Sequence, residues 1–291
     1  MTRYAKDVVR PLPVVLKAQP DELLSSWLAR HARYYGVRRL RLLSHCGLSS
    51  TSLEALDQEI SFGQQIMLAG FFRREPCEIA AMSHVAIRPE FRSLIRRSLP
   101  VQQCQYCAEA AEPSEAAGAI GKSWMQGWRI TCRVCGNPLV DTAASRQLGM
   151  QSGHFAEHWE TACAGEQFFE SRTSSSSNLG PSPMTVLRLL MLPRWPHPHE
   201  MWSGYRQSRL LNVVLPGFDD LVHTLKLKPA LFRNFFLPVD LRVPLLAGVA
   251  VVMRNPGNMI SKLRDNTRSH DRRRFADIET ETQNGTESTS S

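Results

Sequence analysis

The sequence predicts a mainly α-helical protein in which a zinc-ribbon-like module separates two helical regions. Apolar residues recur at helical spacing before residue 100 and again after residue 184. Strand-like alternation of apolar and polar residues is scarce. Two Cys-x-x-Cys pairs, Cys104 with Cys107 and Cys132 with Cys135, lie between the helical regions. These three observations together predict the fold class.

The chain is expected to divide into five segments. They are an N-terminal helical or helix-turn-helix domain (1–100), a zinc-binding module (101–170), a Ser-rich linker (171–183), a C-terminal helical region (184–264) and a disordered tail (265–291).

Composition narrows the classes of function. The 291 residues carry a formal net charge of +8, and the positive charge is concentrated on both sides of the cysteine-bearing segment. Basic regions attract polyanions, but on charge alone an ordinary solvated face is the leading interpretation and a nucleic-acid partner is the alternative. The N-terminus has no apolar signal-peptide core. The longest apolar run, Val243 to Met253, is far shorter than the roughly 20 residues of a membrane helix. We therefore expect a cytoplasmic protein with no membrane partner.

The N-terminal domain is expected to be a bundle of short helices. Pro20-Asp21-Glu22 would open the first, because a proline and acidic residues suit a first helical turn. Gly36 would end it, and a short arginine-bearing helix would follow. A Ser-Thr-Ser run before Leu53 would cap the next helix.

A helix-turn-helix unit is predicted from Ile66 onwards. One apolar helix ends at Phe72, a short break follows, and Pro76 starts a second helix. Basic residues at this turn and on the preceding short helix are candidates for contacts to DNA, although such bundles also bind proteins. The candidate DNA-binding residues are Arg38, Arg39, Arg41, Arg73 and Arg74.

The four paired cysteines predict a structural zinc site. Thiolates at Cys104, Cys107, Cys132 and Cys135 can surround one tetrahedral ion, and Gly136 suits the tight turn after the second pair. The interval of 24 residues between the pairs is slightly long, and the alanine-rich segment 108–121 is expected to absorb the excess as an extended loop. A thioredoxin-like redox pair is disfavoured because no βαβ pattern surrounds it. Four thiolates would leave no open position for catalysis.

The remaining cysteines and two histidines allow weaker interpretations. Cys46 and Cys77 are expected to be small core residues. His154, His158 and Cys163 follow helical spacing and could form a second structural metal site. The run from His154 to His158 also matches the His-x-x-Glu-His pattern of one metalloprotease class. Ordinary helix residues are the leading interpretation of all three.

The C-terminal half is expected to be helical after the Ser-rich linker. A helix would begin near Met184, and segments 217–227 and 229–237 would form a second helix-turn-helix. Lys226, Lys228 and Arg233 could meet phosphates there or simply be solvated. The polar tail after Asp265 is expected to be disordered.

The opening segment resembles that of the TniQ family of transposition proteins. Its Pro-rich lead is followed by an acidic residue and a Leu-x-Ser-Trp-Leu-x-basic pattern. The helix-turn-helix and the cysteine module follow in the order that the family has, over about residues 10–142. The matching residues are Leu24, Ser26, Trp27, Leu28, Arg30, Trp124, Trp128 and Leu139. The family often has His as its fourth ligand, where this chain has Cys135. A weaker similarity lies at 237–264, where Asn-Pro replaces the family's Trp-Pro.

The resemblance implies a target-selecting or accessory adaptor in DNA transposition. Such a protein works beside an AAA+ ATPase of the TniB or TnsC type and, indirectly, a DDE transposase. Some relatives bridge an RNA-guided CRISPR complex to the ATPase, and others bind an attachment site in DNA. This chain has neither the phosphate-binding Gly-x-x-x-x-Gly-Lys loop of the ATPase nor a DDE-type strand pattern, so we expect no enzymatic activity. A zinc-containing helix-turn-helix regulator unrelated to transposition is the alternative, and a metal-dependent hydrolase built on His154, Glu157 and His158 is the third hypothesis.

Overall fold

The computed structural model describes residues 10–48, 51–97, 100, 102–112, 114–142, 156–174, 180–195, 208–224, 237–276 and 278. The fold is mainly helical, as predicted, with one two-stranded sheet of β1 and β2. The chain forms two compact units, which we describe separately. No helix in the described part of the chain is both long enough and apolar enough to cross a membrane.

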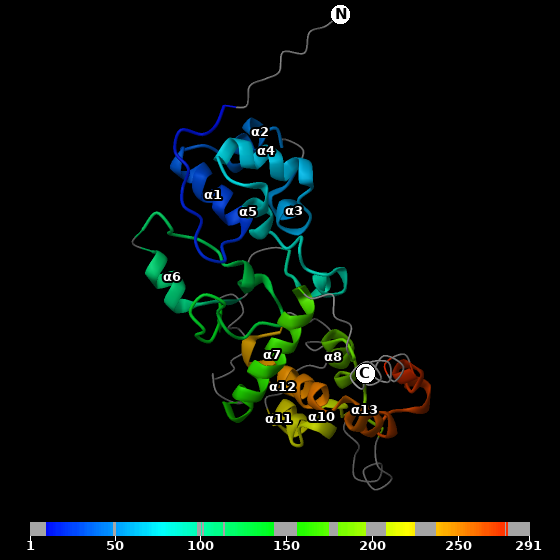
Figure 1. The fold of residues 1–291 in the computed structure, drawn as a ribbon. Helices are drawn as coiled ribbons and strands as arrows, with labels where there is room; N and C mark the ends of the chain where they lie inside the picture. The colour runs from blue at the N-terminus through cyan, green and yellow to red at the C-terminus, as the bar shows by residue number, and fades with distance from the viewer. Residues whose placement is uncertain are drawn as a thin grey trace, which may run out of the picture. The chain divides into compact units, whose positions relative to one another are not determined.

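Unit 1 comprises residues 1–88, 95–126 and 131–140. Its helices α1 to α5 lie together and are blue to cyan in Figure 1. Its elements are α1 (Leu24–Tyr34), α2 (Arg39–His45), α3 (Leu53–Gln58), α4 (Phe62–Phe72), α5 (Pro76–Ala81), β1 (Gln102–Gln103), α6 (Gln105–Ala111) and the 3₁₀ turn η2 (Lys122–Met125). The strand β2 (Val140–Asp141) begins where this unit ends.

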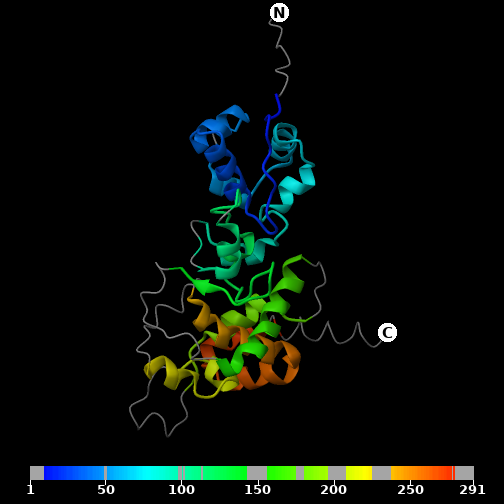
Figure 2. The ribbon, with the colours of Figure 1, turned by 90° about the vertical axis from the view of Figure 1, so that its left-hand side faces the viewer.

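The apolar core of unit 1 forms around α1, with Trp27, Leu28 and Phe72 fully buried. The Pro-rich lead lies along this core and is visible in Figure 2 as the blue segment beside the helices. The main chain of Leu16 is held twice: its N–H donates to His31 Nε2 at 2.9 Å, and its carbonyl accepts from the Trp27 indole at 3.0 Å. Burial lowers the pKa of His31 to about 4, so the ring is neutral and serves as a structural acceptor.

The predicted helix-turn-helix pair is present as α4 and α5. The helix α4 begins at Phe62, earlier than expected, because Ser61 and Gln64 form a capping box. Arg73 ends this helix in the left-handed conformation with φ of 48°, and Pro76 begins α5 as predicted. The Ser52 side chain caps α3, also as predicted.

The first helix does not open on Pro20-Asp21-Glu22. It begins at Leu24 with no acidic residue in its first turn, because both acids are used elsewhere. Asp21 has φ of 59°, and its carboxylate accepts from the Ser123 N–H at 2.9 Å. The first turn of α1 is capped instead from α3, where the Asp57 carboxylate accepts from the Ser25 N–H at 2.8 Å.

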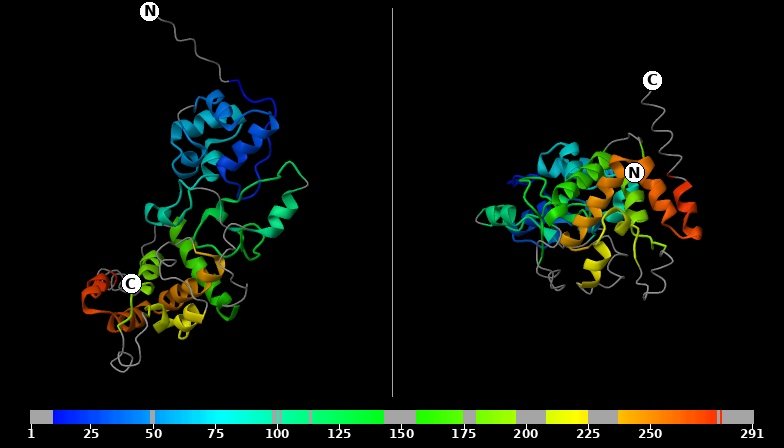
Figure 3. Two further views of the ribbon diagram at one scale, coloured as in Figure 1. Left: turned by 180° about the vertical axis from the view of Figure 1, so that it is seen from behind. Right: turned by 90° about the horizontal axis from the view of Figure 1, so that it is seen from below.

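Unit 2 comprises residues 89–94, 127–130 and 141–291. Figure 3 shows its two longest helices, α7 (green) and α12 (orange), from two further directions. The elements are η1 (Pro89–Leu94), η4 (Ala156–His158), α7 (Trp159–Ser174), α8 (Pro183–Leu190), α10 (Leu211–Val214), α11 (Phe218–Thr224), α12 (Val239–Arg254), α13 (Pro256–Asp265) and η6 (Ser269–Asp271).

A glycine lets α7 and α12 pack closely. A Cβ atom at Gly165 would lie 2.0 Å from the main-chain oxygen of Leu246, so no other residue fits without moving a backbone. On α12, a Cβ at Gly248 would lie 2.4 Å from the Leu211 side chain. Most of α12 is buried, which makes it the central helix of this unit.

The division into units differs from the segments expected from the sequence. The expected module 101–170 is split: residues 101–126 and 131–140 belong to unit 1, whereas residues 127–130 and 141–170 belong to unit 2. The reason is local packing: the Trp128 ring stacks on Phe169 at 6.1 Å between centroids, and Arg129 pairs with Glu166 at 2.8 Å. A single domain boundary placed along the sequence cannot describe a short segment that packs with the other unit.

Three further expectations need correction. The segment 108–121 is not wholly extended, because its first four residues belong to α6. The helix α7 continues to Ser174, so the first part of the expected linker is helical, and residues 175–179 lie outside the described residues. Cys77 is exposed, unlike Cys46, which is buried as expected.

The expected disordered tail begins too early. Phe275 is fully buried and Ile278 nearly so, and the Thr267 hydroxyl donates to the Leu263 carbonyl at 2.7 Å. The apolar side chains that follow the basic run account for this packing. Residues 279–291 lie outside the described residues. The helices α8 and α11 lie where expected, but the partner of α11 in the second helix-turn-helix falls within 225–236, also outside them.

Candidate metal centre

Four thiols from two segments of unit 1 converge on one point. The sulfur atoms of Cys104, Cys107, Cys132 and Cys135 all lie within 4.8 Å of one another. The Sγ atoms of Cys104 and Cys135 are 3.4 Å apart, those of Cys107 and Cys132 3.7 Å, and those of Cys107 and Cys135 3.6 Å. These four cysteines could hold a metal ion.

Local backbone geometry brings each pair together. Cys104 is the N-cap residue of α6, and Cys107 lies in the first turn of that helix. The second pair sits on a tight hairpin, where the Gly136 N–H donates to the Cys132 carbonyl at 2.8 Å. Gly136 has φ of 75°, which only glycine adopts at little cost. The turn predicted from the sequence around Gly136 is therefore confirmed.

Burial and hydrogen bonds shift the pKa values of three of the four thiols. Burial raises the pKa of Cys104 to about 11 and raises the pKa of Cys107 further. For Cys135, burial also acts upward, but hydrogen bonds from the Asn137 N–H and the neighbouring thiols outweigh it and lower the pKa to about 7. Buried thiols with raised pKa values become thiolates when a compensating positive charge is present.

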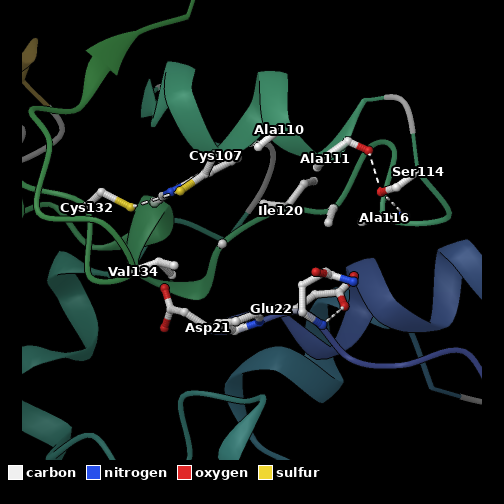
Figure 4. A pocket seen from close by; sticks show the side chains of 15 residues that line it. Asp21, Glu22, Cys107, Ala110, Ala111, Ser114, Ala116, Ile120, Cys132 and Val134 are labelled. Atoms are coloured by element: carbon white, nitrogen blue, oxygen red, sulfur yellow. Dashed lines mark hydrogen bonds between the residues drawn. The ribbon is translucent and has the colours of Figure 1, made fainter.

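A groove of about 220 Å³ lies beside the cysteines and is lined by residues of unit 1 alone. Figure 4 shows Cys107 and Cys132 at one end, with Ala111 and Ser114 of the α6 region at the other. Asp21 and Glu22 form the opposite wall. Both carboxylates already accept hydrogen bonds within the unit, so the groove is a mainly apolar hollow beside the cysteine cluster.

A buried arginine on α1 forms an ion pair and also hydrogen-bonds to the cysteine module. Arg30 donates to the Glu22 carboxylate at 2.8 and 2.9 Å, and the two side chains are 3% and 0% exposed. The same guanidinium donates to the carbonyls of Glu115 and Lys17, each at 2.7 Å. Ser26 adds a second link, because its hydroxyl accepts from the Ile120 N–H at 2.9 Å. We call these contacts the α1 clamp.

The remaining residues of the TniQ-like resemblance, two tryptophans and a leucine, are buried in different units. Trp124 is buried in unit 1 beside Gly121, where a Cβ atom would lie 2.8 Å from the indole nitrogen. Trp128 is buried in unit 2, and its indole donates to Glu170 at 3.0 Å. Leu139 is buried just after the second cysteine pair. The tryptophan expected within the zinc module therefore serves the core of the other unit.

The five candidate DNA-binding arginines fall into two groups. Arg38, Arg39 and Arg41 are exposed on and next to α2. Arg73 and Arg74 lie at the turn between α4 and α5, where Arg74 pairs with Glu78 at 3.7 Å. The structure thus places two basic sites on unit 1, of which only the first lacks an adjacent acidic residue.

The second candidate metal group is not assembled in the described residues. His158 lies in the 3₁₀ turn η4 and approaches Glu157 at 3.6 Å, and Cys163 lies on α7. His154 lies outside the described residues. Within the described ranges, the four cysteines of unit 1 are the group that could hold a metal ion.

Sequence reasoning missed three structural roles. Glu22 was expected at a helix start but neutralises Arg30; Asp57 caps α1 from another helix; and Arg33 donates to the Ala117 carbonyl.

Comparison with protein-family models, with curated proteins and with solved structures found no match.

Proposed function

We propose that this chain is a zinc-containing, non-catalytic adaptor of DNA transposition. It links a DNA-targeting component, either DNA itself or an RNA-guided CRISPR complex, to an AAA+ ATPase of the TniB or TnsC type. Through that ATPase it acts indirectly on a DDE transposase. The observation that carries the proposal is the α1 clamp, in which Ser26 and Arg30 of the TniQ-like pattern tie α1 to the cysteine module.

The α1 clamp supports the proposal because it gives two residues of the TniQ-like pattern specific structural contacts. Polar residues in a chance match would be expected at the surface, whereas Ser26 and Arg30 are 4% and 3% exposed and form specific contacts. The pattern and the cysteine module therefore act as one folding unit, in the order that the resemblance implies.

Zinc is the metal that suits the four sulfurs. A tetrahedral ion with Zn–S distances of about 2.3 Å has sulfur–sulfur edges of about 3.8 Å. The closest approaches here, 3.4 to 3.7 Å, are near that value. A multi-iron cluster would hold its thiolates further apart than a single ion does. Zinc in this site supplies folding energy, and four thiolates leave no position for a reactive water, which supports a non-catalytic role.

The cysteine state also supports a cytoplasmic location. None of the seven cysteines forms a disulfide. Such a pattern is typical of a reducing compartment, where paired cysteines serve metal sites.

The test is capture of a TniB- or TnsC-type ATPase from the same genome by the full zinc-loaded chain, in the presence of ATP. We expect the ATPase to be retained by the wild type and by Cys77→Ser, and to be lost with Cys132→Ser. Deleting the gene should abolish site-selective insertion when insertion sites are sequenced. A chain that captures no ATPase but protects one fixed operator in a footprint is a regulator, and the adaptor proposal would then be wrong.

A further inference from the structure

The segment from α1 to the start of α3 has an unusual charge pattern. Residues 23–53 contain five arginines and neither Asp nor Glu. Glu22 neutralises Arg30 within the α1 clamp, and no other arginine of the segment has a carboxylate partner in the described part of the chain. The uncompensated charges belong to Arg33, Arg38, Arg39 and Arg41.

Three of these arginines line a groove. It lies between the second half of α1 and the start of α2, has a volume of about 440 Å³, and has no carboxylate in its lining. Arg33, Arg38 and Arg39 contribute guanidinium groups, while Val37 and Leu40 supply apolar surface. Leu40 is 70% exposed, although it lies between two arginines on a short helix.

The position of Arg33 is fixed by the loop after α6. Its guanidinium donates to the Ala117 carbonyl, and the next residue, Gly118, has φ of 76°. A Cβ atom at Gly118 would lie 3.4 Å from Arg33 Nη1, an ordinary contact, so the positive φ is what favours glycine at this position. The groove is therefore a formed feature with one anchored and two exposed guanidinium groups.

The other basic site is different. At the turn between α4 and α5, Arg73 and Arg74 are followed by Glu75 and Glu78, and Arg74 pairs with Glu78. Two acidic residues beside two basic ones cancel most of the local field. On electrostatic grounds this turn is a poor site for a polyanion, although it occupies the place that the sequence favoured.

We propose that the groove between α1 and α2 binds the phosphodiester backbone of duplex DNA, and that the α4–α5 turn does not. The inference deepens the proposed function, on which it rests, by assigning the DNA contact of the adaptor to Arg33, Arg38 and Arg39. Guanidinium groups donate in a planar fork that matches phosphate oxygens. Leu40 would then meet the sugars between phosphates.

The polar lining decides between DNA and an acidic protein segment. A peptide would bring backbone N–H groups that need acceptors when buried. The side chains that line the groove offer only guanidinium donors and the Ser26 hydroxyl, which already accepts from Ile120 and donates to Glu22. A phosphodiester backbone brings acceptors alone, and therefore fits this donor set.

The experiment measures binding of a fluorescein-labelled DNA duplex of arbitrary sequence to the full zinc-loaded chain at several salt concentrations. Three phosphate contacts should weaken binding about 40-fold between 50 and 200 mM salt. Arg38→Ala/Arg39→Ala should lower the salt slope by about 2 and weaken binding at 50 mM salt at least tenfold. The matched control, Arg73→Ala/Arg74→Ala, removes the same charge from the other basic site and should change affinity less than twofold. Thermal melts of both variants should match the wild type, because all four residues lie at or near the surface.

Three results would overturn the inference. They are an unchanged salt slope in Arg38→Ala/Arg39→Ala, an equal or larger loss in the control, and competition by polyglutamate as strong as that by unlabelled duplex, which would assign the groove to an acidic protein segment. The ATPase capture is run on the same variants. If the ATPase is not captured but DNA binding still depends on the groove, the adaptor proposal is wrong and the groove assignment stands. If the ATPase is captured but DNA binding does not depend on the groove, the groove assignment is wrong and the adaptor proposal stands.

Discussion

Unit 1 and unit 2 solve the problem of holding helices together in different ways. The helices α1 to α5 of unit 1 have 6 to 11 residues, whereas α7 and α12 of unit 2 have 16 each. Helices shorter than about 12 residues are marginal in water. Unit 1 compensates with polar contacts between distant segments and with the cysteine cluster, while unit 2 combines close helix packing at Gly165 with a buried ion pair of Arg129 and Glu166. Substitutions of the cysteine ligands, the Arg30–Glu22 ion pair or Asp57 should therefore change the stability of unit 1 and spare unit 2. A substitution of Gly165 should affect unit 2 and spare unit 1.

The largest expected effect is that of metal removal. A strong chelator under reducing conditions, or Cys132→Ser, should remove backbone protection across 102–126 and 131–140 in hydrogen exchange, because structural zinc contributes about 10 kcal/mol or more in small modules. The loss should extend into α1 through the α1 clamp, while α7 and α12 of unit 2 stay protected. Cys77→Ser is the control, since that thiol is exposed and outside the cluster. Equal loss of protection in both units would show that they share one stability.

The second effect concerns the ion pair of the α1 clamp. Arg30→Met leaves the Glu22 carboxylate buried without its partner and should cost about 3–5 kcal/mol of the stability of unit 1. The double variant Glu22→Gln/Arg30→Met should lose less, because no unpaired charge remains. Denaturant unfolding followed by hydrogen exchange in α1 measures both. The control Arg41→Met removes an exposed charge and should stay within about 0.5 kcal/mol. A double variant that is less stable than Arg30→Met would mean that the clamp acts through packing rather than charge.

The third effect tests unit 2. Gly165→Ala places a Cβ atom against the Leu246 main chain, so α7 and α12 must separate at a cost of about 1–3 kcal/mol. Gly257→Ala is the matched control, because its Cβ would meet nothing within 4 Å and alanine is the better helix former. Thermal melts and hydrogen exchange in α7 report the result. If both variants behave alike, the close approach of the two helices does not limit the stability of unit 2.

Patterns within a few residues of the sequence predicted much of this fold, whereas contacts between distant residues could not be predicted. The cysteine pairs, the turn at Gly136, the cap at Ser52 and the helix start at Pro76 are patterns within a few residues, which the structure confirms. The α1 clamp joins residue 30 to residue 115, and no spacing rule connects them. The exchange of residues 127–130 into unit 2 is equally non-local.

The remaining misses also have physical reasons. Cys77 was expected in the core because cysteine is often buried, but it falls on the outer face of α5. The tail was expected to be disordered because it is polar, but Phe275 and Ile278 are buried. The sequence predicted DNA contacts for all five arginines. The structure distinguishes them, because Arg74 forms an ion pair with Glu78 and the arginines on and next to α2 have no carboxylate partner among the described residues.

The smallest expected effect concerns Asp57, the acid that caps α1. Burial raises the pKa of Asp57 from its ordinary value to about 7, despite hydrogen bonds from Ser25 that act in the opposite direction. Because the folded pKa exceeds the unfolded one, this group stabilises unit 1 fully below about pH 4, and the contribution is lost as pH rises to about 7. Asp57→Asn keeps an acceptor for the Ser25 N–H and has no such dependence.

The variant should therefore match the wild type at pH 4 and be more stable than the wild type at pH 8. Urea unfolding at several pH values, read as the difference between variant and wild type, isolates this contribution. Burial also lowers the pKa values of His31 and His84, so these residues favour the fold as pH rises, but their effect is common to both proteins and cancels. Asp220→Asn, an exposed change on α11, is the control. A variant less stable than the wild type at pH 8 would mean that the ionised carboxylate is the better cap. Charge at the start of α1 would then outweigh burial, and the polar contacts of unit 1 would be stronger than the comparison with unit 2 implies.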